Sequence, residues 1–226
     1  MESAEKLGAR SLIYKLLSSA YYPPEESFLN GDFPGQLRSA LDTLEPGLFA
    51  DEVEKIESYL RDLGEPLELA VEYTRLFRGP VKAEAYPYES MYVDGEIMGA
   101  STLDVLRRYE EAGIAVSDDF RDLPDHIAAE LEFMHYLSAR ELDARQREDQ
   151  DEAVHFQLLA HSFLEDHLAR WVPDFADSIL RNATTPFYLG LARITKGVTI
   201  QAVTESHLFG PAASGRPSPT LLVTPT

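Results

Sequence analysis

Apolar residues recur at helical spacing through almost the whole of this 226-residue chain. In the stretch LPDHIAAELEFMHYL, Ile127, Leu131, Met134 and Leu137 follow at intervals of four, three and three residues, which places them on one face of a helix. Prolines and glycines interrupt the pattern, and no alternating run is long enough for a convincing strand. The sequence therefore predicts an all-α fold, a single compact helical domain of about nine to eleven helices.

Helix-breaking residues divide the chain into segments. We expect helices over 7–21, 36–44, 51–63, 66–77, 101–113, 125–144 and 153–171, and two more that begin at Pro173 and Pro186. Residues 79–99, rich in Gly, Pro and Tyr, are expected to form a long irregular loop between the N- and C-terminal halves. The helical domain is predicted to span 1–210, followed by a Pro- and Ser-rich tail over 211–226.

Two helix starts carry capping residues. Ser101 and Asp104 have the spacing of a capping box, and Gly113 is expected to end the helix that they open. Asp125 is expected to accept hydrogen bonds from the first turn of its own helix.

Composition limits the compartment and the partners. The chain has no cysteine, no apolar run long enough to span a bilayer, and acids where a signal peptide would be basic. These features predict a cytoplasmic protein without direct membrane insertion. With 39 acidic residues against 20 Lys and Arg, the formal charge is -19, which argues against nucleic-acid binding. From composition alone we expect this acidity to serve solubility, and a basic partner is the alternative.

Two Glu-x-x-His pairs raise the alternative of a carboxylate-bridged metal-dependent enzyme. Glu132 with His135 and Glu152 with His155 match the pattern that di-iron bundles place on two helices. If these helices form a hairpin near residue 148, however, the pairs lie about 20 Å and about 10 Å from the turn and miss each other. No metal is therefore expected. His155, His161 and His167, six residues apart, are expected to be ordinary residues at the helix surface or boundary.

Catalysis has weak support in the sequence. His126 with Asp125 or Glu130 can form an acid–base pair, but no nucleophile motif and no phosphate-binding loop accompanies it. We therefore expect no enzyme, no catalytic residue and no cofactor. A carboxylate and an imidazole beside an apolar cleft can instead receive an arginine from a ligand.

Several motifs occur in an order typical of one family. They are Tyr73-x-x-Leu76-Phe77-x-Gly79-Pro80, Pro87-Tyr88-x-Ser90-x-Tyr92, Pro124-Asp125-His126-Ile127 with Glu130-Leu131-x-Phe133-Met134, and the later HLARWVPDF and TPFYLGLA segments. Together they resemble the TorD/DmsD family over roughly residues 5 to 208. The resemblance implies an all-helical, non-catalytic chaperone. It would bind the twin-arginine signal peptide, the apo-form of a molybdenum-containing oxidoreductase subunit, or both, until cofactor insertion and folding are complete. The protein would act as a monomer or a dimer.

The resemblance also implies which residues bind the signal peptide. The matching positions are Tyr73, Leu76, Phe77, Pro87, Tyr88, Ser90, Asp125 and His126. Many members have Glu before the Pro-Asp-His run, whereas this chain has Leu123, with Asp122 beside it. The aromatic residues would line an apolar groove, with Asp125 and Glu89 at its lip, although core packing is an equal alternative for Leu76 and Phe77.

Overall fold

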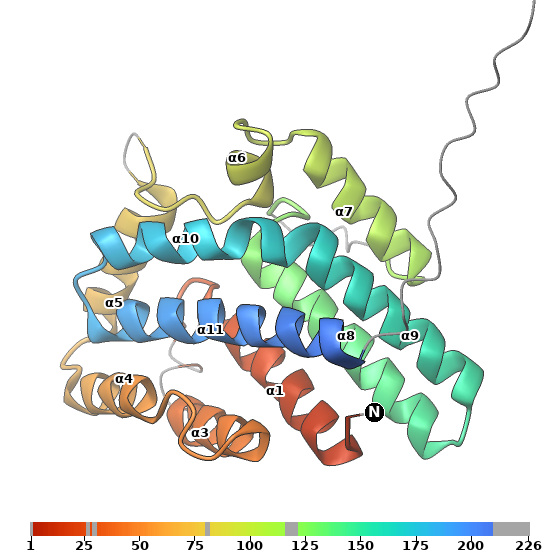
Figure 1. The fold of residues 1–226 in the computed structure, drawn as a ribbon. Coiled ribbons are helices and arrows are strands. Elements are labelled where there is room, and N and C mark those ends of the chain that lie inside the picture. The colour runs from red at the N-terminus through yellow and green to blue at the C-terminus, as the bar shows by residue number, and fades with distance from the viewer. Residues whose placement is uncertain (1, 26–27, 29–30, 80–81, 116–121, 210–226) are drawn as a thin grey trace, which may run out of the picture.

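The computed structural model describes residues 2–25, 28, 31–79, 82–115 and 122–209, and within these ranges the chain is helical without a strand (Figure 1). The all-α prediction is confirmed. The helices are α1 (Ala4–Ala20), α3 (Phe33–Leu44), α4 (Ala50–Asp62), α5 (Pro66–Tyr73), the π-helical turn η1 (Thr74–Arg78), α6 (Glu89–Val93), α7 (Ala100–Glu111), α8 (Ile127–Gln146), α9 (Gln150–Phe163), the π-helical turn η2 (Leu164–Leu168), α10 (Ala169–Asn182) and α11 (Pro186–Phe209). The expected tail over 211–226 lies outside the described residues.

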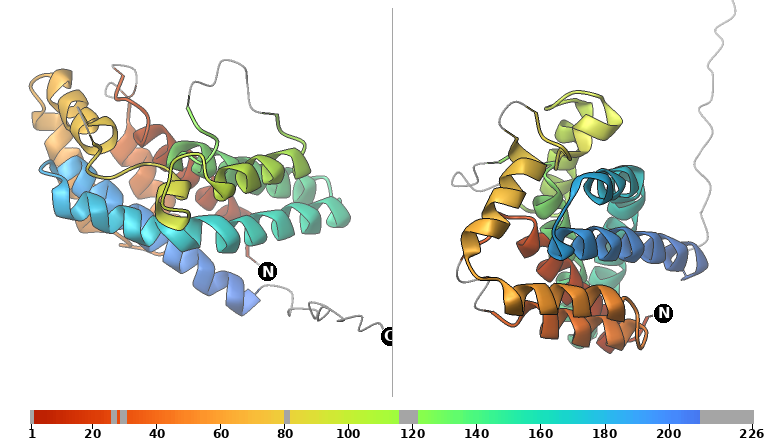
Figure 2. Two further views of the ribbon diagram at one scale, coloured as in Figure 1. Left: turned by 90° about the horizontal axis from the view of Figure 1, so that it is seen from above. Right: turned by 90° about the vertical axis from the view of Figure 1, so that its left-hand side faces the viewer.

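One long rod organises the bundle. Helix α9, turn η2 and helix α10 continue into one another, and α11 packs against α10 while α8 packs against α9. Helix α1 lies on α8, and α3 and α4 complete the bundle through α1 and α11. Figures 1 and 2 show α6 and α7 on one side of this rod and α11 with α3 and α4 on the other. None of the helices in the described ranges has the length and apolar content needed to cross a membrane.

The prediction that a helix begins at Pro173 is wrong, because Pro173 lies inside α10. Proline lacks an N–H and crowds the preceding turn, so it normally ends or kinks a helix. Here η2 precedes it, and the Ala169 N–H bonds to the Leu164 carbonyl, five residues back. Such a π turn shifts the hydrogen-bond register locally, and the rod continues past the proline. Pro186 begins α11 as expected.

The stretch 79–99 is less irregular than expected, since it contains the short helix α6. The prediction that Ser101 and Asp104 form a capping box at the start of α7 is also wrong. Ser101 lies within α7, and its N–H and hydroxyl both donate to the carboxylate of Asp94, at the end of α6. Asp94 thus supplies the acceptor expected from α7 itself. Gly113 follows the end of α7 as predicted and has a φ of 77°.

Aromatic rings fill the centre of the bundle. Trp171 is fully buried and packs on Phe175, which also contacts Tyr21 and Phe77. Burying a side chain of this size contributes about 1.5–3 kcal/mol. The rod, α1 and η1 therefore share one core, in which Trp171 has a structural role.

Candidate functional site

The segment before α6 is fastened to the start of α8. Tyr88 and His126 form an isolated antiparallel bridge, and the neighbouring Glu89 N–H donates to the carbonyl of Asp125 over 3.0 Å. Two motifs that are distant in the sequence therefore meet at one place, directly beside the buried end of α8.

Turn η1 directs its apolar residues into the core. Leu76 is fully buried and Phe77 is 2% exposed, with its ring edge-on to Tyr73 at 5.2 Å between centroids. The chain leaves η1 at Gly79, where φ is 60° and an added Cβ would lie 2.1 Å from the carbonyl oxygen of Lys82. Only glycine fits such a conformation and such a close approach. Leu76 and Phe77 therefore pack in the core in this structure.

All eight residues expected to bind a signal peptide are buried. They fall into two groups, one in the aromatic core (Tyr73, Leu76, Phe77) and one around the Tyr88–His126 bridge (Pro87, Tyr88, Ser90, Asp125, His126). Asp125 and Glu89, expected at an exposed lip, are both 0% exposed. That part of the prediction is wrong, because both carboxylates point into the protein.

The capping role expected for Asp125 is also wrong. Its Oδ2 atom accepts a hydrogen bond from the Ser90 N–H at 3.0 Å, so the carboxylate caps α6 instead of its own helix. The residue that caps α8 is His126, whose Nδ1 accepts from the Ala128 N–H at 3.1 Å. The contact with Ser90 links α6 to the start of α8.

His126 is a neutral imidazole in this setting. Burial lowers its pKa to about 4, despite the nearby carboxylates of Asp122 and Asp125. Because Nδ1 accepts from Ala128, the proton resides on Nε2. That N–H lies 3.9 Å from Asp122 Oδ2 and has no hydrogen-bond partner within the described part of the chain.

Asp122 forms the partly exposed edge of the site. Its Oδ1 accepts from the Tyr88 hydroxyl at 2.8 Å and from the Leu123 N–H at 3.0 Å, and its Oδ2 accepts from Arg78 Nη2 at 2.7 Å. Burial raises the pKa of Asp122, but other causes outweigh it and hold the pKa below its usual value. They are the positive charge that the His126 ring gains at acid pH, the hydrogen bonds from Tyr88 and Leu123, and the Arg78 charge. The side chain is 14% exposed, so this carboxylate is charged and within reach of solvent.

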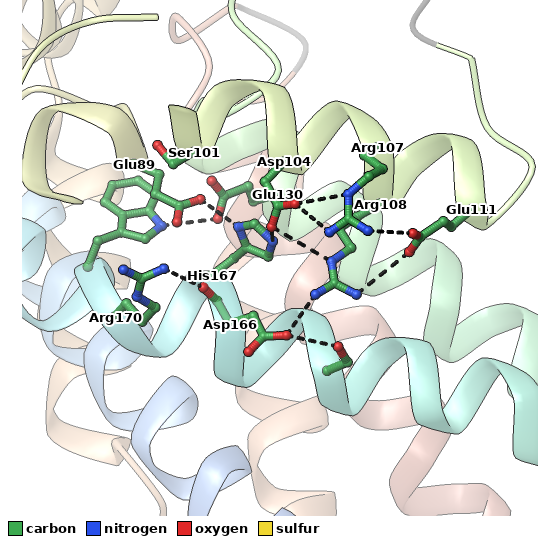
Figure 3. A network of polar contacts seen from close by, with 12 residues as sticks. Glu89, Ser101, Asp104, Arg107, Arg108, Glu111, Glu130, Asp166, His167 and Arg170 are labelled. Atoms are coloured by element: carbon green, nitrogen blue, oxygen red, sulfur yellow. Dashed lines mark hydrogen bonds and ion pairs between the residues drawn. The ribbon is translucent and has the colours of Figure 1, made fainter. Parts of the chain in front are cut away.

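A second polar network lies between α7 and the central rod (Figure 3). His167, on η2, is 1% exposed, with Nδ1 2.9 Å from Glu89 Oε2 and Nε2 3.3 Å from Asp104 Oδ2. Next to it Arg108, on α7, binds Asp166 on the rod at 2.7 Å. These contacts attach α6 and α7 to the rod.

Glu130 extends this network into the core. It is fully buried, and its Oε2 accepts from the Trp171 indole N–H at 3.1 Å. Burial, followed by the charge of Glu89, raises the pKa of Glu130 well above its usual value. The raised pKa favours the protonated, uncharged form of Glu130, which makes it easier for two carboxyl groups to share a dry site.

Sequence reasoning missed His167. It was grouped with His155, which is exposed, and with His161, which is partly exposed. The apolar stripe Phe163, Leu164, Leu168 and Trp171 surrounds His167 at helical spacing, and this pattern is the signal that places it on the buried face. No pattern in the sequence pairs Asp122 with Arg78, because the two residues come together only in the folded protein.

The two Glu-x-x-His pairs have other partners. His135 Nδ1 lies 2.8 Å from the Ser11 hydroxyl on α1, and Glu152 binds both Arg140 and Arg147 at 2.6 Å. Glu132 is exposed. The hairpin between α8 and α9 turns where expected. Across the described ranges, no three His, Asp or Glu side chains gather in a group that could hold a metal ion.

Known proteins match this chain over most of its length. The perchlorate reductase assembly chaperone protein of Dechloromonas aromatica (strain RCB) is 28% identical over 219 residues, covering 92% of this chain and 94% of that protein. The chaperone protein TorD of Vibrio parahaemolyticus serotype O3:K6 (strain RIMD 2210633) is 28% identical over 192 residues, covering 83% and 84%.

The comparison with solved structures and the comparison with protein families agree. A crystal structure from Archaeoglobus fulgidus, described as a redox enzyme maturation protein, superposes with a TM-score of 0.52 at 21% identity, covering 83% of this chain and 91% of that one. The family described as nitrate reductase delta subunit matches residues 46–177, which include η1, the Tyr88–His126 bridge and the buried network. The resemblance to the TorD/DmsD chaperones is confirmed, and the chain belongs to the nitrate reductase delta subunit family.

Proposed function

We propose that this protein is an assembly chaperone for a molybdenum-containing oxidoreductase. The observation that carries the proposal is the match along nearly the whole chain to a protein named as a reductase assembly chaperone. The buried histidine and carboxyl groups serve binding and structure in this proposal, and the protein is not an enzyme.

The client is the apo-form of the catalytic subunit, its twin-arginine leader, or both. The chaperone holds it in the cytoplasm until cofactor insertion and folding are complete, and acts as a monomer or a dimer. Such a leader presents cationic side chains followed by an apolar segment, so its receptor needs a carboxylate beside apolar surface. The partly exposed Asp122 next to Tyr88, in a chain of formal charge -19, supports this proposal.

Leader binding requires the segment before α6 to move. The residues around the Tyr88–His126 bridge form the wall of the site in this proposal, while Tyr73, Leu76 and Phe77 support it from the core. The isolated Tyr88–His126 bridge holds this segment to α8, together with the hydrogen bonds that the Glu89 and Ser90 N–H groups donate to Asp125. For the segment to shift, these contacts have to break, but no core helix has to unfold.

The client can be identified by affinity purification of the intact chain from its native host, followed by mass spectrometry of the bound protein. We expect the precursor of a molybdenum-containing oxidoreductase subunit that retains its leader. Recovery of cofactor-loaded, processed enzyme, or of no reductase subunit, would contradict the proposal.

Calorimetry then separates the leader from the body of the client. A synthetic peptide with two adjacent arginines followed by an apolar stretch should bind the chaperone, and the same peptide with both arginines changed to glutamine should bind more weakly. A client subunit without its leader that binds as tightly as the precursor would assign recognition to the folded body alone.

A further inference from the structure

The carboxylate of Asp122 already holds a guanidinium group. Arg78 Nη2 lies 2.7 Å from Asp122 Oδ2, and the Tyr88 hydroxyl, 2.8 Å from Oδ1, fixes the other carboxylate oxygen. The site therefore has the geometry and charge that an arginine side chain needs, because the chain itself supplies one.

Arg78 is the more exposed partner of this ion pair. It is the last residue of η1, and 45% of its side chain is exposed, so water can replace the ion pair as it opens. With one exposed partner, the pair is less costly to open than a fully buried one. Asp122, only 14% exposed, stays in place because the Tyr88 hydroxyl and the Leu123 N–H also bind it.

An unpartnered donor lies beside the pair. The Nε2–H of His126 is buried, lies 3.9 Å from Asp122 Oδ2 and donates to no group among the described residues. A buried donor without an acceptor is unfavourable unless something else accepts the hydrogen bond. A backbone carbonyl next to a bound arginine would satisfy it.

We propose that Arg78 occupies the site of a leader arginine, and that leader binding exchanges the Arg78 guanidinium on Asp122 for one from the peptide while His126 donates to the peptide backbone. This inference rests on the proposed function. It makes Asp122 a binding residue, next to Leu123, where this chain departs from the Glu of the family pattern. It also makes Arg78 an internal competitor.

The exchange favours arginine over lysine in the ligand. A guanidinium presents several N–H groups in a planar fork, whereas an ammonium is a compact point charge. The groups facing the incoming side chain are the Asp122 carboxylate and the Tyr88 hydroxyl, which suit a forked donor. A peptide with lysine in place of the contacting arginine should therefore bind more weakly.

The test measures affinity of the full chain for the synthetic twin-arginine peptide by calorimetry. Arg78→Ala should tighten binding about two- to fivefold, because a site that is partly filled by its own arginine binds with an affinity reduced by the filled fraction. Arg61→Ala is the matched control, since Arg61 is also an exposed arginine in an ion pair, with Glu57 on α4. It removes the same charge and should leave affinity nearly unchanged.

A double-mutant cycle locates the effect on Asp122. Asp122→Asn keeps an acceptor for Tyr88 but removes the charge, and should weaken binding by about tenfold or more. In that background Arg78→Ala should no longer tighten binding. Melting curves of all variants check that the fold persists.

The outcomes separate the two proposals. Equal responses to Arg78→Ala and Arg61→Ala, or weaker binding by Arg78→Ala, would overturn the exchange while leaving leader binding intact. Absence of binding by the wild-type chain and every variant would overturn leader recognition, and the exchange with it. Tightening by Arg78→Ala that persists with Asp122→Asn would show that a different group receives the arginine.

Discussion

His167 and Glu89, which are 78 residues apart in the sequence, form a buried pair with 2.9 Å between Nδ1 and Oε2. The histidine lies on the central rod and the glutamate at the start of α6, so the contact joins the loop region to the bundle. Both side chains are almost completely buried, and neither can be rehydrated without moving α6 or α7.

The first prediction concerns this pair. His167→Ala leaves the buried Glu89 without its partner, and breaking such a pair destabilises by about 3–5 kcal/mol. His155→Ala removes an exposed histidine from the same rod and should change stability by less than about 0.5 kcal/mol. Chemical denaturation of both variants checks the contrast, and similar losses in the two would argue against a structural pair.

The second prediction concerns Glu130. Its folded-state pKa is raised, so its contribution to stability is complete below the usual glutamate pKa and is lost as pH rises through the raised value. Glu130→Gln keeps an oxygen for the Trp171 N–H and does not titrate. The stability of this variant relative to wild type should therefore increase with pH.

Unfolding free energies from pH 5 to pH 8 measure that difference, with about 1.4 kcal/mol for each pKa unit that is traversed. Glu132→Gln, at an exposed position of the same helix, is the control and should run parallel to wild type. A constant difference for Glu130→Gln across this range would mean that Glu130 is ionised throughout.

The third prediction concerns His126, whose pKa is depressed to about 4 from an ordinary 6.5. The folded protein prefers the neutral ring, so the stability it contributes is complete above pH 6.5 and is lost as pH falls towards 4. His126→Asn retains a capping oxygen for the Ala128 N–H but has no titrating ring. The curve of the variant should fall less steeply, by about 3 kcal/mol in total. Parallel curves would contradict a buried neutral imidazole.

Local sequence patterns predicted most of the helices, because periodicity and terminators act over a few residues. They failed where a distant segment decides the local structure. Pro173 signals a helix start, yet η2 and the packing of α10 on α11 carry the helix through it. Ser101 and Asp104 have the spacing of a capping box, yet Asp94 provides the acceptor.

The sequence motifs named some of the residues that meet at this place, but not the contacts between them. The motifs identified Asp125 and His126 as a pair at a helix start, but which of them caps depends on Ser90, from another segment. The contact between Arg78 and Asp122 has no local pattern, because 44 residues separate the two. Ion pairs between distant residues depend on the fold, and so do the pKa shifts of His126 and Glu130.

The last prediction concerns the charge of -19. If this field steers a basic leader, the association rate should fall as salt rises, since the screening length drops from about 10 Å at 0.1 M to about 3 Å at 1 M. Dissociation depends on close contacts and should change much less. Glu54→Lys and Asp62→Lys, at exposed positions on α4, should slow association and leave the residence time nearly unchanged. Stopped-flow kinetics across a salt series with the twin-arginine peptide measure both rates. An association rate independent of salt would assign the acidic surface to solubility and recognition to Asp122 and its neighbours alone.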